Sequence, residues 1–325
     1  MIPVGITRDG AYTLQSDDSD IFALNPHDLP EVHDNGTRVN WPEDASNHEM
    51  TVLYPDGTRK SLGIVDVVFP ILHGLWGEDG TIQGMLELSS VRYVGSRVLA
   101  SALGMDKHFT KIVLDRAGIA VAPWMTVAHH EWRSDPTRVA KQAETLGLPA
   151  FVKPARAGSS VGASKVNDWS ELGPALEVAF AEDTKVLIEQ GVVGREIEMG
   201  VLGSRPGEPA RASLPGEIVL NDRSFYDFAA KYLDAPGIDL VCPADLNSEQ
   251  IQQMQELSVR AFDAIGAEGL ARVDFFLTDE GFVVNEINTM PGFTPISMFP
   301  RCWQESGLSY PELIDELIQL ALSRE

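Results

Sequence analysis

The amino-acid sequence predicts an α/β protein of two or three domains, because it contains two strand-like stretches and one strongly marked helix. Residues 64–72, IVDVVFPIL, form a nearly continuous apolar run typical of buried strands. Residues 271–292, ARVDFFLTDEGFVVNEINTMPG, contain two apolar strands around a short turn. A helix is predicted over 248–265, since Asn247 and Gln250 have capping-box spacing and a glycine follows as a stop. The length of 325 residues provides enough core for such a chain.

Composition and charge exclude several kinds of partner. The formal net charge of −23 opposes binding to nucleic-acid phosphates and to anionic membranes, but it does not exclude a local cationic pocket for a nucleotide. The two cysteines, Cys242 and Cys302, are far apart in sequence and lack a metal-ligand spacing, so we expect reduced packing residues. We find no basic leader and no apolar run long enough to span a bilayer, which predicts a cytoplasmic location.

The first unit, residues 1–107, is expected to be α/β with an irregular insert. Short strands are predicted at 2–6 and 11–14. The acidic stretch 17–50 has no periodicity and is interpreted as a surface insert, whereas 64–72 is expected to be a central parallel strand.

A glycine-rich loop, HGLWGEDGTIQG at residues 73–84, leaves the carboxyl end of that strand, where ligands bind in doubly wound sheets. It carries His73, Glu78 and Asp79, and a helix is predicted from about Thr81. The alternative is a plain glycine-rich connection with an acidic helix cap.

The second unit, residues 108–197, carries a flexible loop at 157–162, AGSSVG. Its expected elements are a helix ending near Gly118, a strand at 120–126, a helix at 135–146 and a strand ending at Lys153. The loop offers backbone amides and hydroxyls that can cover phosphates, with Lys153 supplying charge, although it lacks the Walker pattern. A hairpin turn would also favour Gly and Ser. Two further carboxylates, Glu189 and Glu196, are either ribose and adenine contacts or polar strand ends.

The third unit, residues 198–325, begins with an aromatic and basic loop at 223–236 and ends in a helix that starts near Ser309. The residues expected on the buried face of this last helix are Leu313, Ile314, Leu317, Ile318 and Ala321.

The hairpin at 271–292 is expected to turn through a three-residue loop with Gly281 in its left-handed position, which pairs Thr278 with Phe282. That register gives two polar pairs on one face: Asp274 opposite Glu286, and Arg272 opposite Asn288. The opposite face is expected to carry Val273, Phe275, Val283 and Ile287. Two carboxylates and an amide oxygen suit Mg²⁺ shared with substrate phosphates, and the alternative is a solvated hairpin face.

These motifs together resemble the ATP-grasp superfamily and, closely, D-alanine–D-alanine ligases. HGLWGEDGTIQG is similar to the family's first signature and GLARVDFFLTDEGFVVNEINTMPG to its second. VGSRVLASALGMDK, FVKPARAGSSVG and FYDFAAKY resemble further family blocks in the same order, so the resemblance spans nearly the whole chain. It implies a partial Rossmann-like N-terminal domain at 1–107 and a two-part ATP-grasp domain, with subdomains at 108–197 and 198–325.

The resemblance implies a cytoplasmic ligase for peptidoglycan precursors, with ATP and D-alanine as small-molecule substrates. ATP phosphorylates one D-alanine, and the amine of a second D-alanine displaces phosphate from the acyl phosphate. The alternatives are a catalytically silent ATP-binding homologue, a D-alanine–D-lactate ligase, and another ATP-grasp ligase. The HGLWGEDG block argues against the last, because it belongs to the substrate domain.

The resemblance also implies residue roles. The metal ligands for two Mg²⁺ or Mn²⁺ ions are Asp274, Glu286 and Asn288, with Glu286 bridging. The ATP contacts are Lys107, Lys153, Ser160, Glu189, Glu196 and Lys231. The catalytic residues are Arg272, Ser159, Tyr232 and His73, and the substrate contacts are Glu78, Gly292 and Ser297. Arg272 is implied to stabilise the oxyanion of the tetrahedral intermediate. Tyr232 favours an amine nucleophile, because D-alanine–D-lactate ligases tend to carry a His in its loop.

The amino terminus departs from the family pattern. The family opens with a strand, a Gly-Gly loop and a helix whose glutamate binds the amine of the first D-alanine. Here Met1 is followed at once by IPVGITRDGAYTL, which resembles the family's second strand. We therefore expect a strand–helix unit of about 30 residues to be absent, together with much of the family's homodimer contact.

Overall fold

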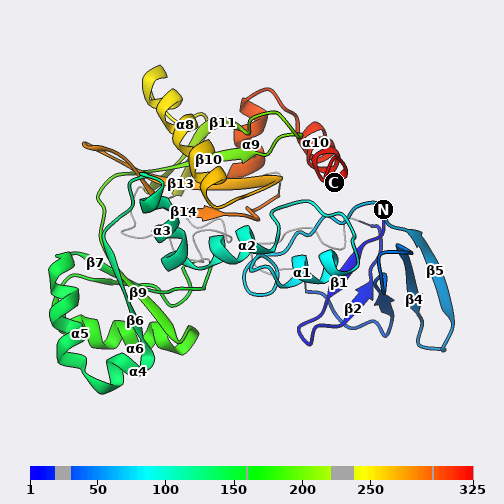
Figure 1. Cartoon of the computed structure of the whole chain (residues 1–325), viewed down its shortest axis with the longest axis horizontal. Coiled ribbons are helices and arrows are strands. Elements are labelled where there is room, and N and C mark those ends of the chain that lie inside the picture. Colours follow the sequence, from blue (N-terminus) through cyan, green and yellow to red (C-terminus); the bar gives the residue numbers. More distant parts are fainter. Residues whose placement is uncertain (19–30, 159, 221–237, 295, 325) are drawn as a thin grey trace.

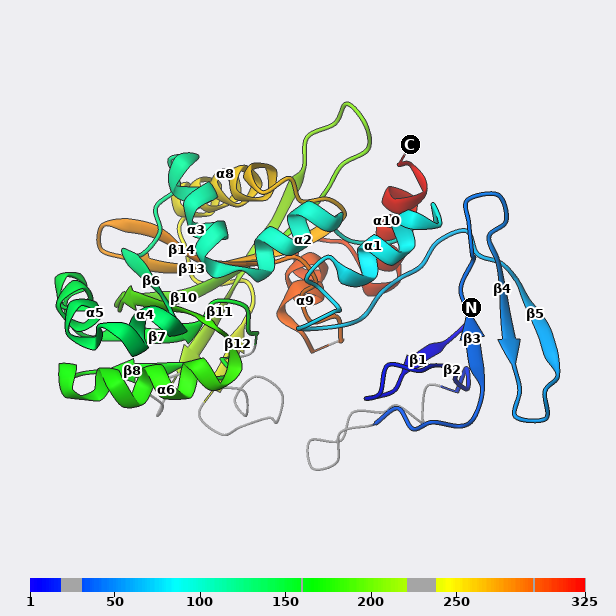
Figure 2. The same ribbon diagram turned by 60° about the horizontal axis from the view of Figure 1, so that its bottom comes forward.

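The computed structural model describes residues 1–18, 31–158, 160–220, 238–294 and 296–324. Two small antiparallel sheets form one end of the molecule (Figure 1). The first pairs β1 (Val4–Ile6) with β2 (Tyr12–Leu14), and the second has the order β3 (Arg38–Asn40), β4 (Glu49–Leu53) and β5 (Arg59–Ile64). Figure 2 shows both sheets standing apart from the remaining strands.

Two expectations for this part are wrong. The stretch 17–50 is not wholly irregular, because it contains β3 and the start of β4, and Val39 and Met50 enter a buried cluster there. Residues 64–72 do not form a continuous parallel strand. Instead, an isolated parallel bridge joins Val68 to Tyr93, held by two backbone hydrogen bonds to Arg92 and Val94. Val65 and Pro70 of this run are buried, whereas Ile64 and Ile71 are exposed, so the apolar composition predicts neither strand pairing nor burial along the whole run.

Three short helices lead from this end to the middle of the molecule: α1 (Thr81–Leu88), α2 (Val98–Met105) and α3 (Lys107–Arg116). The predicted start of α1 at Thr81 is confirmed. Asp106 caps α3, because its carboxylate accepts hydrogen bonds from the amides of His108 and Phe109 at 3.1 and 3.3 Å. This cap fixes Lys107 in the first turn of α3.

A four-stranded antiparallel sheet follows, in the order β6 (Trp124–Ala128), β9 (Lys185–Gln190), β7 (Ala150–Pro154) and β8 (Ser164–Val166). Its helices are α4 (His129–Ser134), α5 (Pro136–Ala143) and α6 (Leu172–Glu182), with short 3₁₀ turns at Glu144–Leu146 and Trp169–Glu171. Together they form a separate lobe in Figure 1. Within this lobe, β9 lies between β6 and β7, so the residues at the end of β9 have a paired strand on each side.

A five-stranded antiparallel sheet holds the rest of the chain, in the order β12 (Ile238–Val241), β11 (Arg211–Leu220), β10 (Arg195–Leu202), β13 (Leu270–Thr278) and β14 (Gly281–Asn288). One face, which carries Ile197, Met199 and Val201, packs on α8 (Ser248–Ala264). The other face packs on α9 (Met298–Glu305), where a Cβ added at Gly200 would come within 3.2 Å of Phe299. The site described below lies on this second face.

The predicted helix caps are confirmed. Asn247 and Gln250 exchange hydrogen bonds of 2.9 and 3.1 Å at the start of α8. The last helix, α10 (Tyr310–Leu322), starts after Ser309 and buries Leu313, Leu317, Leu320 and Ala321, whereas Ile314 and Ile318 are partly buried. Within the described residues, no helix is long and apolar enough to cross a membrane.

The hairpin of β13 and β14 has the predicted polar pairs but not the predicted turn. Thr278 pairs with Gly281 rather than with Phe282, so the loop has two residues. A bulge at Asn285 then adds one residue to β14, and this restores the register that places Asp274 opposite Glu286 and Arg272 opposite Asn288. The bulge also changes the core face, which carries Phe282, Val284 and Ile287 in place of the expected Val283.

Candidate active site

The polar face of the hairpin is organised around Arg272. Its Nε and Nη2 donate to the two carboxylate oxygens of Asp274, both at 2.7 Å, and Nε lies 3.1 Å from Oε2 of Glu198. Burial disfavours its charge, but Asp274 and Glu198 raise the pKa of Arg272 well above its usual value. The guanidinium is therefore a fixed positive charge within an acidic surface.

The predicted metal ligands come together on this face. Asp274 and Glu286 are directly opposite on paired strands, and both line a small cavity that also borders Glu196 and Glu198. Asn288 lies next along β14, with its Oδ1 accepting a hydrogen bond from the amide of Met290 at 3.1 Å. Carboxylate and amide oxygens are the hard donors that Mg²⁺ and Mn²⁺ take, so this donor set fits the implied ions.

A buried ion cluster lies at the end of β9. The carboxylate of Glu189 contacts the ammonium groups of Lys153, on β7, and Lys111, on α3, the second at 3.1 Å. Burial alone would raise the pKa of Glu189, but Lys153 and Lys111 lower it to about 2. Lys111 also donates to the carbonyl of Ala122 at 3.3 Å and lies 5.7 Å from the centre of the Trp124 ring.

Lys153 interacts electrostatically both with Glu189 and with carboxylates on the five-stranded sheet. Burial opposes the charge of Lys153, while Glu189 first, and then Glu286 and Glu196, raise its pKa. The predicted nucleotide contacts Glu189 and Glu196 and the predicted metal ligand Glu286 therefore act on one lysine.

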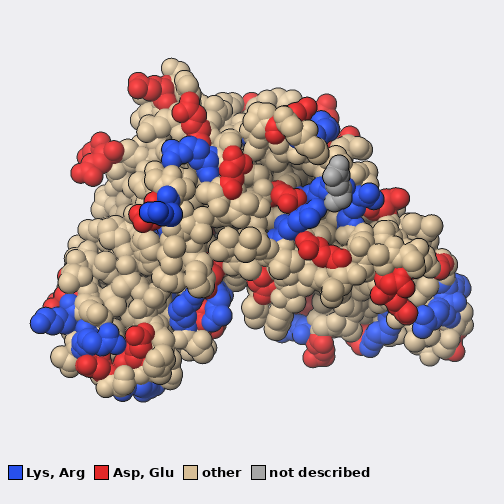
Figure 3. All heavy atoms as spheres, viewed as in Figure 1, with Lys and Arg blue, Asp and Glu red and all other residues tan. Residues whose placement is uncertain are grey.

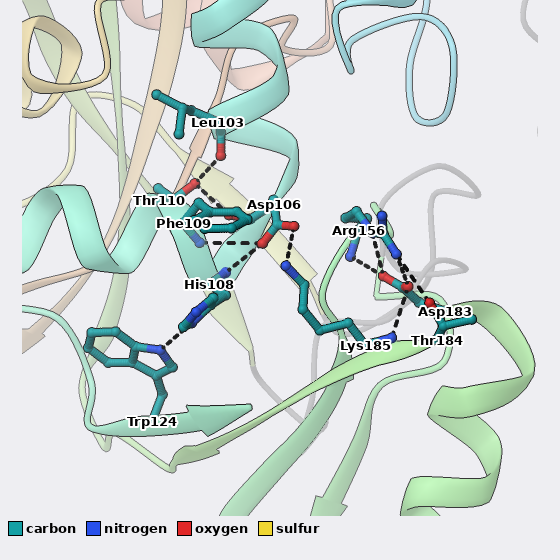
Figure 4. A network of polar contacts seen from close by, with 10 residues as sticks. All are labelled: Leu103, Asp106, His108, Phe109, Thr110, Trp124, Arg156, Asp183, Thr184 and Lys185. Atoms are coloured by element: carbon teal, nitrogen blue, oxygen red, sulfur yellow. Dashed lines mark hydrogen bonds and ion pairs between the residues drawn. The ribbon is translucent and has the colours of Figure 1, made fainter. Parts of the chain in front are cut away.

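The loop that follows β7 is held by a network around the start of α3 (Figure 4). Lys107 donates from Nζ to the carbonyl of Ala157 at 2.6 Å and from its backbone amide to Ala155 at 3.0 Å. Asp106 pairs with Lys185 at 2.5 Å, and the guanidinium of Arg156 donates two hydrogen bonds to Asp183 at 3.1 and 2.5 Å. Consequently α3, β9 and the start of the loop at 155–163 are tied together.

Contacts of Glu78 and His73 hold the glycine-rich loop at residues 73–84 next to the hairpin and the loop after β7. Oε1 of Glu78 accepts a hydrogen bond from the amide of Gly74 at 2.6 Å. The same oxygen lies close to Gly158, in the loop after β7, since a Cβ added to this glycine would be 3.9 Å away from it. Burial raises the pKa of Glu78 to about 7, and Glu286 adds to the shift. His73 Nδ1 lies 3.0 Å from the carbonyl of Met290, so it carries the proton and donates there. Burial lowers the pKa of His73. The loop at 73–84 thus joins the hairpin and the loop after β7.

The segment after β14 fixes the position of the Ser297 hydroxyl. Oγ of Ser297 accepts from the amide of Thr294 at 3.1 Å and lies 2.8 Å from the Thr294 hydroxyl. A Cβ added at Gly292 would lie only 3.0 Å from this Oγ, so the glycine permits the backbone to approach the serine closely. The predicted pair Gly292 and Ser297 is therefore brought together.

Three of the predicted residues, Ser159, Lys231 and Tyr232, lie outside the described residues. Two residues of the site were not predicted, Lys111 and Glu198. Each had a signal in the sequence, because Lys111 lies one helical turn from Lys107 and Glu198 lies two residues from Glu196 on the same strand face. Figure 3 shows the surface hollowed between the lobe of the four-stranded sheet and the N-terminal end, with Lys and Arg side chains along one wall.

Comparison with known proteins gives a consistent result. Two family models match the chain, "D-ala D-ala ligase N-terminus" over residues 1–96 and "D-ala D-ala ligase C-terminus" over residues 113–319. The D-alanine–D-alanine ligase of Paenarthrobacter aurescens is 52% identical over 328 residues, covering 100% of this chain and 87% of the relative. The enzyme of the same name from Streptomyces coelicolor is 49% identical over 335 residues, covering 100% and 85%.

Solved structures agree with these matches. The D-alanine–D-alanine ligase of Coxiella burnetii superposes with a TM-score of 0.78 at 34% identity, covering 98% of this chain and 83% of that one. The VanG D-Ala:D-Ser ligase of Enterococcus faecalis gives 0.83 at 35% identity, covering 98% and 89%. The expected mixed α/β fold, an N-terminal domain followed by an ATP-grasp domain, is thereby confirmed. The chain belongs to the D-alanine–D-alanine ligase family.

Proposed function

We propose that this chain ligates two D-alanines to D-alanyl-D-alanine at the expense of ATP, forming ADP and phosphate, as a step in peptidoglycan precursor synthesis. The observation that carries the proposal is the convergence of three separate segments. The acidic hairpin with Arg272, the loop carrying Glu78 and the lysines around Glu189 surround one surface. We also propose the three-part division at 1–107, 108–197 and 198–325, with β10 crossing the second boundary.

The nucleotide is proposed to bind along the line from Glu189 to the hairpin. We assign Glu189 and Glu196 to the adenine and ribose, whose N–H and O–H groups donate to carboxylates. Lys107 and Lys153 supply positive charge for the phosphates, and Ser160 lies in the loop beside them. Asp274, Glu286 and Asn288 would hold the Mg²⁺ or Mn²⁺ ions, and the bound ions would neutralise phosphate charge during transfer.

Other residues of the chain are proposed to stabilise the oxyanion and to bind the two D-alanines. Arg272 is held rigidly by Asp274 and Glu198, so its guanidinium is preorganised to donate to the oxyanion of the tetrahedral intermediate. We assign Glu78 and His73 to binding and orienting the first D-alanine. In this proposal the hydroxyl of Ser297 and the amide of Gly292 hold the carboxylate of the second D-alanine, which aligns its amine for attack.

The test is ADP and phosphate formation by the full chain with ATP and Mg²⁺, with and without D-alanine. We expect turnover that requires D-alanine and yields the dipeptide in equal amount. Nucleotide binding without D-alanine-dependent turnover would instead support the silent homologue. Offering D-lactate as the second substrate measures specificity, and preferential depsipeptide formation would overturn the dipeptide assignment.

A further inference from the structure

The fold brings together two cysteines that are far apart in sequence. Cys242 follows the last residue of β12, and Cys302 lies within α9. They are 60 residues apart, and their sulfur atoms are 3.7 Å apart. The chain has no other cysteine. The sequence predicted separate packing residues, so their juxtaposition is a property of the fold alone.

The surroundings of the pair favour a reaction between the two thiols. Cys302 is fully buried, whereas Cys242 is partly exposed, so one sulfur is accessible to a small reagent and the other is shielded. The apolar side chains of Ile218, Leu240 and Met298 pack around the pair, and the charges of Glu305 and Arg301 act on Cys242. The hydrogen bond between the two thiols lowers the pKa of Cys242 and raises that of Cys302, so Cys242 is the sulfur that ionises first.

Local geometry allows the sulfur atoms to approach further. A disulfide needs a separation of about 2 Å, so the pair must close by less than about 2 Å. The last paired residue of β12 is Val241, opposite Glu217 on β11, and Cys242 lies just beyond this pairing. Its side chain can therefore turn toward α9 without breaking a described pair of the sheet.

We propose that Cys242 and Cys302 are a modification site at which a peroxide oxidant forms an intramolecular disulfide between β12 and α9. The Cys242 thiolate attacks one oxygen of hydrogen peroxide, the O–O bond breaks, and the released hydroxide takes a proton to become water. The Cys302 sulfur then attacks the sulfur of the Cys242 sulfenic acid, the S–O bond breaks, and a second water leaves. Two thiols and one peroxide give one disulfide and two waters, with two electrons passing from the sulfurs to the peroxide.

The bond would join the edge of the five-stranded sheet to the helix that begins directly after Ser297. It closes a long chain loop, which should stabilise the oxidised form against thermal unfolding. This inference is independent of the proposed ligase activity, because it rests on the positions, exposure and surroundings of the two thiols.

The test uses the full reduced chain, treated with a small excess of hydrogen peroxide and then with a thiol-alkylating reagent. Intact-mass measurement should show a monomer that has lost about 2 Da and takes up no alkyl group. Dithiothreitol should restore two alkylatable thiols, and peptide mapping should recover the segments around residues 242 and 302 as one linked species. The oxidised monomer should also melt at a higher temperature than the reduced chain.

The matched controls are Cys242→Ser and Cys302→Ser, each checked for native circular dichroism. Neither should lose about 2 Da or gain thermal stability, and Cys302→Ser should instead accumulate oxygen adducts on Cys242. The inference is overturned if the wild-type chain keeps both thiols alkylatable. It is equally overturned if Cys242 gains oxygen without pairing, or if the disulfide joins two chains on a non-reducing gel.

Discussion

Replacing Lys111 with Met tests whether the buried ion cluster serves the nucleotide site. In the wild type two ammonium groups share the carboxylate of Glu189, and the side chains of Lys111 and Glu189 are only 3% and 6% exposed. Removing Lys111 leaves Lys153 as the counter-ion. Lys153 is then held more tightly by Glu189 and is less available to ATP phosphates, so we expect the KM for ATP to rise.

The expected magnitude follows from the burial of the cluster. Removing one partner of a buried ion pair typically costs about 3–5 kcal/mol, and retention of Lys153 reduces this to about 2 kcal/mol. If that cost falls on nucleotide binding, the KM for ATP rises on the order of 30-fold with a smaller change in kcat. If part of it falls on folding, the free energy of unfolding decreases by the remainder.

The pH dependence gives an independent check. The pKa of Glu189 is lowered to about 2, so its contribution to stability is complete above its ordinary pKa of 4.5 and is lost as the pH falls toward 2. In Lys111→Met the pKa should rise, and the acid-unfolding midpoint should move to higher pH. Lys165→Met is the control, since Lys165 is exposed on β8. A KM within twofold of the Lys165→Met value, with the same acid midpoint, would refute the reasoning.

Three further changes test other parts of the site. Asp274→Asn should reduce D-alanine-dependent ADP formation by about 10³-fold or more in steady-state assays and should weaken Mn²⁺ binding in calorimetry. The reason is that a ligand charge and the main partner of Arg272 are lost. The control Asp279→Asn, in the exposed turn, should change neither quantity. Burial raises the pKa of Glu78 to about 7, so the free energy of unfolding of the wild type decreases as the pH rises from 4.5 through 7. In denaturant titrations Glu78→Gln should make this decrease smaller by up to about 3 kcal/mol. An unchanged decrease would contradict the assignment. Gly292→Ala should raise the KM for the second D-alanine roughly tenfold while leaving the KM for ATP unchanged, because the added Cβ would lie 3.0 Å from Oγ of Ser297.

The hairpin shows what the sequence could and could not predict. The pairing of Asp274 with Glu286 was predicted correctly, but from a loop that was one residue too long. The bulge at Asn285 offsets that error. Alternation of apolar residues locates the strands and their length, yet a bulge changes the count by one without leaving a clear mark in composition. The predicted core residue Val283 was wrong for the same reason.

Contacts between distant segments were not predictable from the residues alone. Lys111 and Glu189 lie in different elements, and their contact depends on β9 lying between β6 and β7 and on α3 packing beside them. No periodicity encodes such a contact. By contrast, the cap of α8 at Asn247 depends on residues three positions apart, so local sequence was sufficient.

The strongly negative chain and its proposed nucleotide site are reconciled by where the charges lie. Two glutamates have opposite shifts: the pKa of Glu189 falls to about 2 beside two lysines, whereas burial, with Glu286 nearby, raises that of Glu78 to about 7. One end of the surface therefore presents ammonium groups, while the hairpin end gathers carboxylates around a single described guanidinium, Arg272. A nucleotide alone would bring its phosphates toward these carboxylates and be repelled. A nucleotide carrying divalent ions would satisfy both ends at once, which is why we propose that ATP binds together with its metal rather than by itself.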